Sequence, residues 1–149
     1  MIIERKLKNG IPVFFDKIDE IQSVTIGIFV GTGSKHEKKD EYGVSHLLEH
    51  MMFKGTNKRT AKELSEEIDD IGGNINAYTG KETTAYYIQL LSSRLDVGID
   101  ILSDMFLNST FTEENLEKEK KVVIEEINMY EDIPEEKVHD INSIFAISG

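Results

Sequence analysis

The chain has 149 residues and a net charge of -11, with 17 lysines and arginines against 28 aspartates and glutamates. This length and a 39% share of hydrophobic residues are enough for one domain with a buried core, which excludes a disordered chain. The chain has no dense basic block, no apolar run near the roughly 20 residues that cross a bilayer and no apolar signal core, so we expect a cytoplasmic protein without nucleic-acid or membrane partners.

The first elements in chain order are predicted strands. An Asn-Gly pair supplies the positive φ of a two-residue turn between residues 2–7 and 11–15, which predicts a β-hairpin. Residues 23–30 alternate with period two, which predicts a strand with at least one buried face. After a charged, irregular segment, the apolar stretch at residues 44–53 predicts a buried helix.

A capping box then begins the next predicted helix. Thr60 and Glu63 have the spacing at which each side chain satisfies a free backbone N–H, and a Gly-Gly pair ends this helix after residue 71. Residues 74–79 and 83–91 are rich in β-forming residues and joined by a short Gly-Lys-Glu segment, which predicts a second hairpin.

The last part of the chain is predicted to be helical. Apolar residues recur at helical spacing over residues 94–108, a Thr112 cap begins a helix that ends at about residue 130, and a proline begins another over about residues 135–145. Pairs of strands and pairs of helices follow one another along the chain. This order predicts an α+β domain, with a mainly antiparallel sheet flanked by helices.

One motif in the apolar stretch predicts a metal site. His46, Glu49 and His50 form the pattern H-x-x-E-H, in which the two histidines lie one helical turn apart on one face and can reach the same metal ion. With no cysteine in the chain, only histidine and carboxylate ligands are left. Glu49 lies on the neighbouring strip, where it can act as general base toward a water on that metal. The alternative is a chance match, but three ionisable groups in an apolar helix need partners, which favours zinc ligation.

A third ligand must come from another segment, and the acidic helix after residue 112 is the natural source. Glu119 and Glu126 are seven residues apart and share a helix face with apolar neighbours, where an unpaired carboxylate is costly. Glu125 points about 100° away, toward solvent. For Glu126 taken alone, ligation and a solvated acidic face are equally good interpretations.

Further motifs surround this pattern across nearly the whole chain. They are a glutamate 76 positions after His50 within E-K-K-V-V-I-E-E-I, Gly31-Thr32-Gly33-Ser34 leading to Glu37, Gly43, Phe53-Lys54-Gly55-Thr56, and Gly72-Gly73-Asn74-Ile75-Asn76-Ala77-Tyr78-Thr79. With them the chain resembles the pitrilysin or insulinase family (M16) of zinc peptidases, the inverzincins, which includes mitochondrial processing peptidases and bacterial processing-protease-like proteins.

The resemblance implies a zinc-dependent metalloendopeptidase with an M16 peptidase-like (LuxS–MPP-like) fold. It implies His46, His50 and Glu126 as ligands of one Zn²⁺ per chain. It also implies that Glu49 is the general base for a zinc-activated water that hydrolyses the peptide bond, and that Glu119 is a second acid that orients the catalytic site.

The resemblance also assigns a substrate site. Peptide would add as a further strand beside residues 74–79, so that Asn76, Ala77 and Tyr78 flank the scissile bond and Glu82 lies near it. The residues taken alone favour a purely structural hairpin. His36 and His139 match no ligand position and are predicted to be surface residues.

Family members are usually built from two or four homologous α/β domains that close around the substrate. Residues 1–149 would then be a truncated N-terminal zinc-binding peptidase domain, with an apolar end where the family pattern continues. The substrate-gripping arginine and tyrosine would come from a second homologous half or subunit, or from the partner in a homodimer. We therefore do not expect activity from this piece alone.

The alternative from another class is a noncatalytic or substrate-recruiting subunit of a processing-peptidase-like complex. Such relatives typically lose zinc-site residues, whereas this chain keeps them, which favours the enzyme. A structural zinc site is disfavoured because such sites usually have four protein ligands, often cysteine. The acidic charge further predicts basic peptides as substrates.

Overall fold

The structure, a computed structural model, describes residues 2–131. Its centre is a three-stranded antiparallel sheet of order β3-β5-β4, made of β3 (Ser23–Val30), β4 (Asn74–Thr79) and β5 (Thr84–Leu91). The predicted second hairpin is confirmed, with Asn76 opposite Tyr87 in its register. Central strand β5 is the most buried strand, while β3 and β4 alternate between exposed and half-buried side chains, as expected for edge strands.

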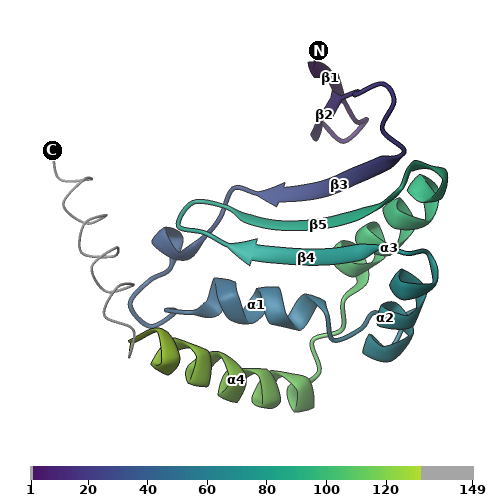
Figure 1. Ribbon diagram of the computed structural model, residues 1–149. Coiled ribbons are helices and arrows are strands. Elements are labelled where there is room, and N and C mark those ends of the chain that lie inside the picture. The colour runs from purple at the N-terminus through teal and green to yellow at the C-terminus, as the bar shows by residue number, and fades with distance from the viewer. Residues whose placement is uncertain (1, 132–149) are drawn as a thin grey trace, which may run out of the picture.

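The predicted first hairpin is also confirmed, but it forms a sheet of its own. β1 (Ile2–Lys6) and β2 (Pro12–Asp16) pair antiparallel around Gly10, whose φ of 90° is the left-handed conformation that the turn requires. Figure 1 shows this hairpin beyond the end of the central sheet, and most of its side chains are exposed. The sequence does not indicate this separation, because pairing between two distant hairpins depends on packing.

The predicted helices within the described residues are all present. Thr60 and Glu63 form the predicted capping box, and Gly72, with a φ of 64°, follows the end of that helix. The predicted helix at residues 135–145, and with it His139, lies outside the described residues. No helix within residues 2–131 has both the length and the apolar character needed to cross a membrane. The helices are α1 (Val44–Met52), α2 (Ala61–Asp70), α3 (Leu95–Asn108) and α4 (Glu113–Glu131), with 3-10 turns η1 (Ser34–His36) and η2 (Ser92–Arg94).

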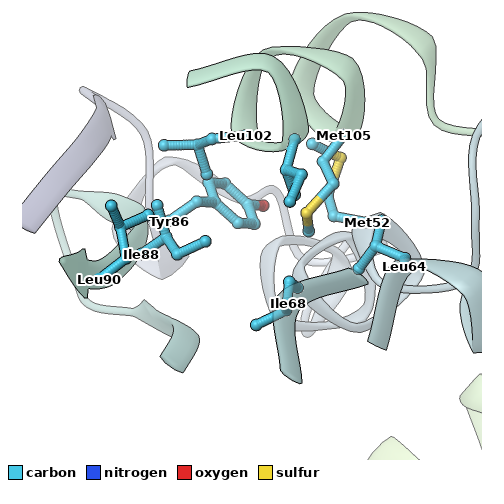
Figure 2. Packing of buried hydrophobic residues seen from close by; sticks show 9 residues of the cluster. Met52, Leu64, Ile68, Tyr86, Ile88, Leu90, Leu102 and Met105 are labelled. Carbon is cyan, nitrogen blue, oxygen red and sulfur yellow. The ribbon is translucent and has the colours of Figure 1, made fainter. Parts of the chain in front are cut away.

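The core lies between the central sheet and the helices. Side chains of β5 meet those of α3 and α2 and the end of α1, as Figure 2 shows. Burial of these apolar side chains provides the main free energy that holds the elements together. The buried members are Met52, Leu64, Ile68, Tyr86, Ile88, Leu90, Ile101, Leu102 and Met105.

Helix α1 is less buried than its apolar sequence predicts. Met51 and Met52 are buried, but Leu48 is 46% and Val44 50% exposed. The reason is the position of α1, which runs beside edge strand β4, with α4 next to it (Figure 1). The remaining surface of α1 is left uncovered by the described part of the chain.

Candidate metal centre

The start of α1 is fixed by a carboxylate from the preceding loop. Glu37 accepts hydrogen bonds from the backbone N–H groups of Gly43 and Ser45, at 2.8 and 2.7 Å. Gly43 has a φ of 88°, a conformation that glycine adopts without strain. Burial opposes ionisation of Glu37, but these backbone donors outweigh it and hold its pKa below the ordinary 4.5. The first turn of α1 is therefore anchored just before His46.

Three side-chain atoms converge beside α1. His46 Nε2 and His50 Nε2 lie 3.1 Å apart, and Glu126 Oε2 from α4 lies 3.4 and 3.5 Å from them. Tetrahedral zinc with bonds of about 2.0–2.1 Å separates its ligand atoms by about 3.3 Å. The triangle therefore has the dimensions expected for three ligand atoms of one zinc ion.

Solvent can reach this triangle. The side chains of His46, His50 and Glu126 are 29%, 19% and 37% exposed, so water can reach the point where their three atoms converge. Within residues 2–131 these three form the one group of His, Asp and Glu side chains with metal-binding geometry. Glu125, the residue before Glu126, is exposed, as predicted.

Glu119, which the family resemblance predicts to be an orienting acid, is in contact with His50. Its Oε2 lies 3.1 Å from His50 Nδ1, and its Oε1 lies 2.8 Å from Lys54 Nζ. Burial raises the pKa of Glu119, but the hydrogen bonds from Lys54 and His50 lower it below the ordinary range, so the carboxylate is ionised. A His50 that donates its Nδ1–H to Glu119 presents the Nε2 lone pair to a metal.

Glu49 lies beside the triangle without belonging to it. The Thr79 hydroxyl, on β4, donates a hydrogen bond to Glu49 Oε2. Burial, together with the negative charge of Glu49, raises the pKa of the Tyr86 hydroxyl to about 12. Glu49 therefore contacts β4 and lies close enough to Tyr86 for its charge to act on that hydroxyl.

Sequence reasoning assigned no role to Lys54 or Thr79. Both lie in motifs that carry the family resemblance, and that resemblance is the one sequence signal for them. Their roles depend on contacts with side chains 65 and 30 residues away in the sequence, which periodicity does not reveal.

The predicted substrate residues lie on and after the edge strand. Within residues 2–131, β4 pairs with β5 alone, so its other edge has no strand partner. Asn76 and Tyr78 are exposed, whereas Ala77 is half-buried and donates its backbone N–H to Asn76 Oδ1 at 2.8 Å. Glu82 lies in the turn after β4, where it forms an ion pair with Lys35, and it is not among the three converging side chains.

His36 is exposed, in agreement with its prediction as a surface residue. Its Nδ1 accepts a hydrogen bond from the backbone N–H of Gly33 at 3.2 Å.

Comparison with known proteins identifies relatives across most of the chain. Residues 13–144 match the model of the family described as insulinase (peptidase family M16). The chain is 48% identical over 143 residues to the Bacillus subtilis protein named "Uncharacterized zinc protease YmxG". It is 40% identical over 134 residues to the Arabidopsis thaliana protein named "Probable mitochondrial-processing peptidase subunit beta, mitochondrial". A crystal structure of a Helicobacter pylori protease superimposes with a TM-score of 0.80 at 27% identity.

The matches cover most of this chain but a minor part of each relative. They span 96% of the chain and 35% of the Bacillus protein, 90% of the chain and 25% of the Arabidopsis protein, and 85% of the chain and 30% of the Helicobacter protease. The chain thus spans between a quarter and about a third of the length of these proteins.

Proposed function

Because the chain belongs to the insulinase family of peptidases, family M16, we propose that it is the zinc-binding catalytic domain of a metalloendopeptidase. The observation that most strongly supports the proposal is the triangle of His46 Nε2, His50 Nε2 and Glu126 Oε2, with sides of 3.1 to 3.5 Å. These three side chains would hold the zinc. When bound, zinc supplies a Lewis acid that polarises a carbonyl oxygen and lowers the pKa of water.

In the proposed mechanism the chain's own residues move and hold protons. Glu49 takes a proton from the attacking water and returns it to the nitrogen of the leaving amine. The Thr79 hydroxyl already engages Glu49 Oε2, which leaves Oε1 to accept that proton. Glu119 acts indirectly, because it holds His50 through Nδ1.

The geometry favours an enzyme over the other two interpretations. A noncatalytic subunit does not need a general base, whereas this chain has Glu49 on the same helix as the two histidines, hydrogen-bonded to Thr79. A structural zinc site usually has four protein ligands, whereas three side chains converge here among the described residues. Three protein ligands would leave a bound zinc one position for a reacting water.

The proposed function also involves a peptide substrate and a second domain or subunit. We propose that peptides add to the open edge of β4, with Asn76, Ala77, Tyr78 and the nearby Glu82 at the scissile region. Basic peptides suit a chain with a net charge of -11. Residues 1–149 would be an N-terminal domain that works with a second homologous half or subunit, or as a homodimer. The cytoplasmic location stays a prediction from sequence.

Metal analysis with matched variants tests the function. The purified protein should contain about one zinc per chain, His50→Ala should lose it, and His36→Ala should keep it. In the full-length protein, Glu49→Gln should keep the zinc and lower the peptide hydrolysis rate at least about 100-fold. Zinc absent from a metal-replete, chelator-free preparation contradicts the metal site. Full activity of Glu49→Gln contradicts the role of Glu49 as base.

A further inference from the structure

A lysine next to α1 makes contact with the acid behind His50. Lys54 is the second residue after α1, and its Nζ lies 2.8 Å from Glu119 Oε1. The other oxygen of this carboxylate lies 3.1 Å from His50 Nδ1. The carboxylate therefore lies between the ammonium and the histidine, with one oxygen for each.

The backbone around Lys54 is fixed by the surrounding structure. The Lys54 N–H donates to the Met51 carbonyl at 3.1 Å, and the Gly55 carbonyl accepts from the Thr110 N–H at 2.9 Å. Gly55 has a φ of 108°, and a Cβ there would lie 2.9 Å from the Arg59 carbonyl oxygen, so the chain turns tightly at this point. The Lys54 side chain is 31% exposed, against 60% for Lys58 in the same loop.

We propose that Lys54 is a positioning residue of the metal centre, which holds the Glu119 carboxylate in the orientation that accepts the His50 Nδ1–H. Through Glu119 it keeps His50 Nε2 directed at the metal position. This inference rests on the proposed zinc site and adds a residue that touches neither the metal position nor the substrate strand.

The burial of Glu119 explains why a partner is required. Its side chain is 10% exposed, so without Lys54 one carboxylate oxygen would be buried and unpaired. Rotation of the carboxylate toward water would relieve this cost and would also break the contact with His50. Loss of such outer contacts typically weakens metal binding by about 10- to 100-fold.

Repulsion between the ammonium and a metal dication acts in the opposite direction but is smaller. Lys54 and His50 contact different oxygens of the Glu119 carboxylate, whose negative charge offsets the field of the ammonium. Partial exposure of the ammonium screens it further. Removal of Lys54 should therefore weaken zinc binding.

Zinc affinity of the full chain, measured by competition with a chromophoric chelator, tests the inference. Lys54→Met should bind zinc about 10-fold more weakly, and Lys54→Arg should recover affinity to within about threefold of wild type. Lys58→Met, in the same loop, should match wild type. Unchanged or tighter binding by Lys54→Met overturns the inference. A wild-type protein without zinc contradicts the proposed function itself, and this inference with it.

Two further measurements distinguish positioning from a general structural role. In a Glu119→Gln background, Lys54→Met should change zinc affinity less than about twofold, because its route to His50 is already lost. An equal loss in both backgrounds overturns the inference. In the zinc-free protein, ¹⁵N NMR of the imidazoles should show His50 as the Nδ1–H tautomer in wild type and a mixture of tautomers in Lys54→Met. The same tautomer in both proteins also overturns it.

Discussion

The Thr79 hydroxyl donates a hydrogen bond to Oε2 of Glu49, so the last residue of edge strand β4 holds the side chain proposed as the general base. The same hydroxyl lies 3.5 Å from the Ser45 carbonyl oxygen in the first turn of α1. One contact thus joins the strand proposed to bind substrate to the helix that contributes the base and two histidines.

Replacement of Thr79 by valine should impair catalysis more than binding. In the full-length protein, Thr79→Val should lower kcat about 10-fold or more, because Glu49 loses the donor that orients it, while KM and zinc content stay near wild type. Peptidase kinetics and metal analysis measure these effects. Thr79→Ser should retain kcat within about threefold, and Thr25→Val, on the exposed face of β3, is the matched control. A kcat for Thr79→Val equal to that of the control argues against orientation of Glu49.

Two neighbouring glutamates on α4 allow a matched test of the proposed third zinc ligand, because replacing either one by glutamine removes the same charge. Glu126→Gln should weaken zinc binding more than about 100-fold, since loss of a ligand costs more than loss of an outer contact. Glu125→Gln removes an equal charge from an exposed neighbour and should leave the affinity unchanged. Chelator competition measures both. Similar affinities for the two variants would indicate that Glu126 is part of a solvated acidic face.

Glu37 should stabilise the fold in a pH-dependent way. Loss of this capping carboxylate in Glu37→Gln should lower the free energy of unfolding by about 1 kcal/mol at pH 7. Because its folded-state pKa lies below 4.5, this stabilisation is present above that pH and is lost as the pH falls through the folded-state pKa. Urea denaturation at several pH values should show the gap between wild type and variant closing below about pH 4.5. Glu66→Gln, in an exposed helical pair, is the control. A gap that stays constant with pH would mean that the charge of Glu37 is not what stabilises α1.

Arg59 links the loop after α1 to two helices, and its removal should be costly. Its guanidinium, 12% exposed, lies 2.6 Å from Glu67 on α2 and 2.8 Å from Asp104 on α3, whose side chain is 1% exposed. Arg59→Met leaves Asp104 without its cation and should lower the free energy of unfolding by about 3 kcal/mol. Urea denaturation measures the loss. Lys58→Met, which breaks an exposed ion pair, should cost less than about 1 kcal/mol. Equal effects of the two variants would show that the burial of this network adds nothing to stability.

The sequence by itself determined the local structure and the first half of the site. Turn and cap residues such as Gly10 and Thr60 act within a few positions, so both hairpins and the α2 boundaries were predictable. The spacing of His46 and His50 follows from the pitch of one helix, because that pitch is a property of the backbone. Apolar sequence overstated the burial of α1, because it does not reveal that this helix lies at the edge of the sheet.

Only the tertiary structure decided which acids meet the histidines. The residue pattern alone left ligation by Glu126 and a solvated acidic face equally balanced, and the family resemblance implied Glu126. The packing of α4 beside α1 brings Glu126 to the two Nε2 atoms and Glu119 to His50 Nδ1. Lys54 and Thr79 gained their contacts in the same way. These partners are separated by 30 to 80 positions in the chain, and their meeting depends on how elements pack, which local periodicity does not encode.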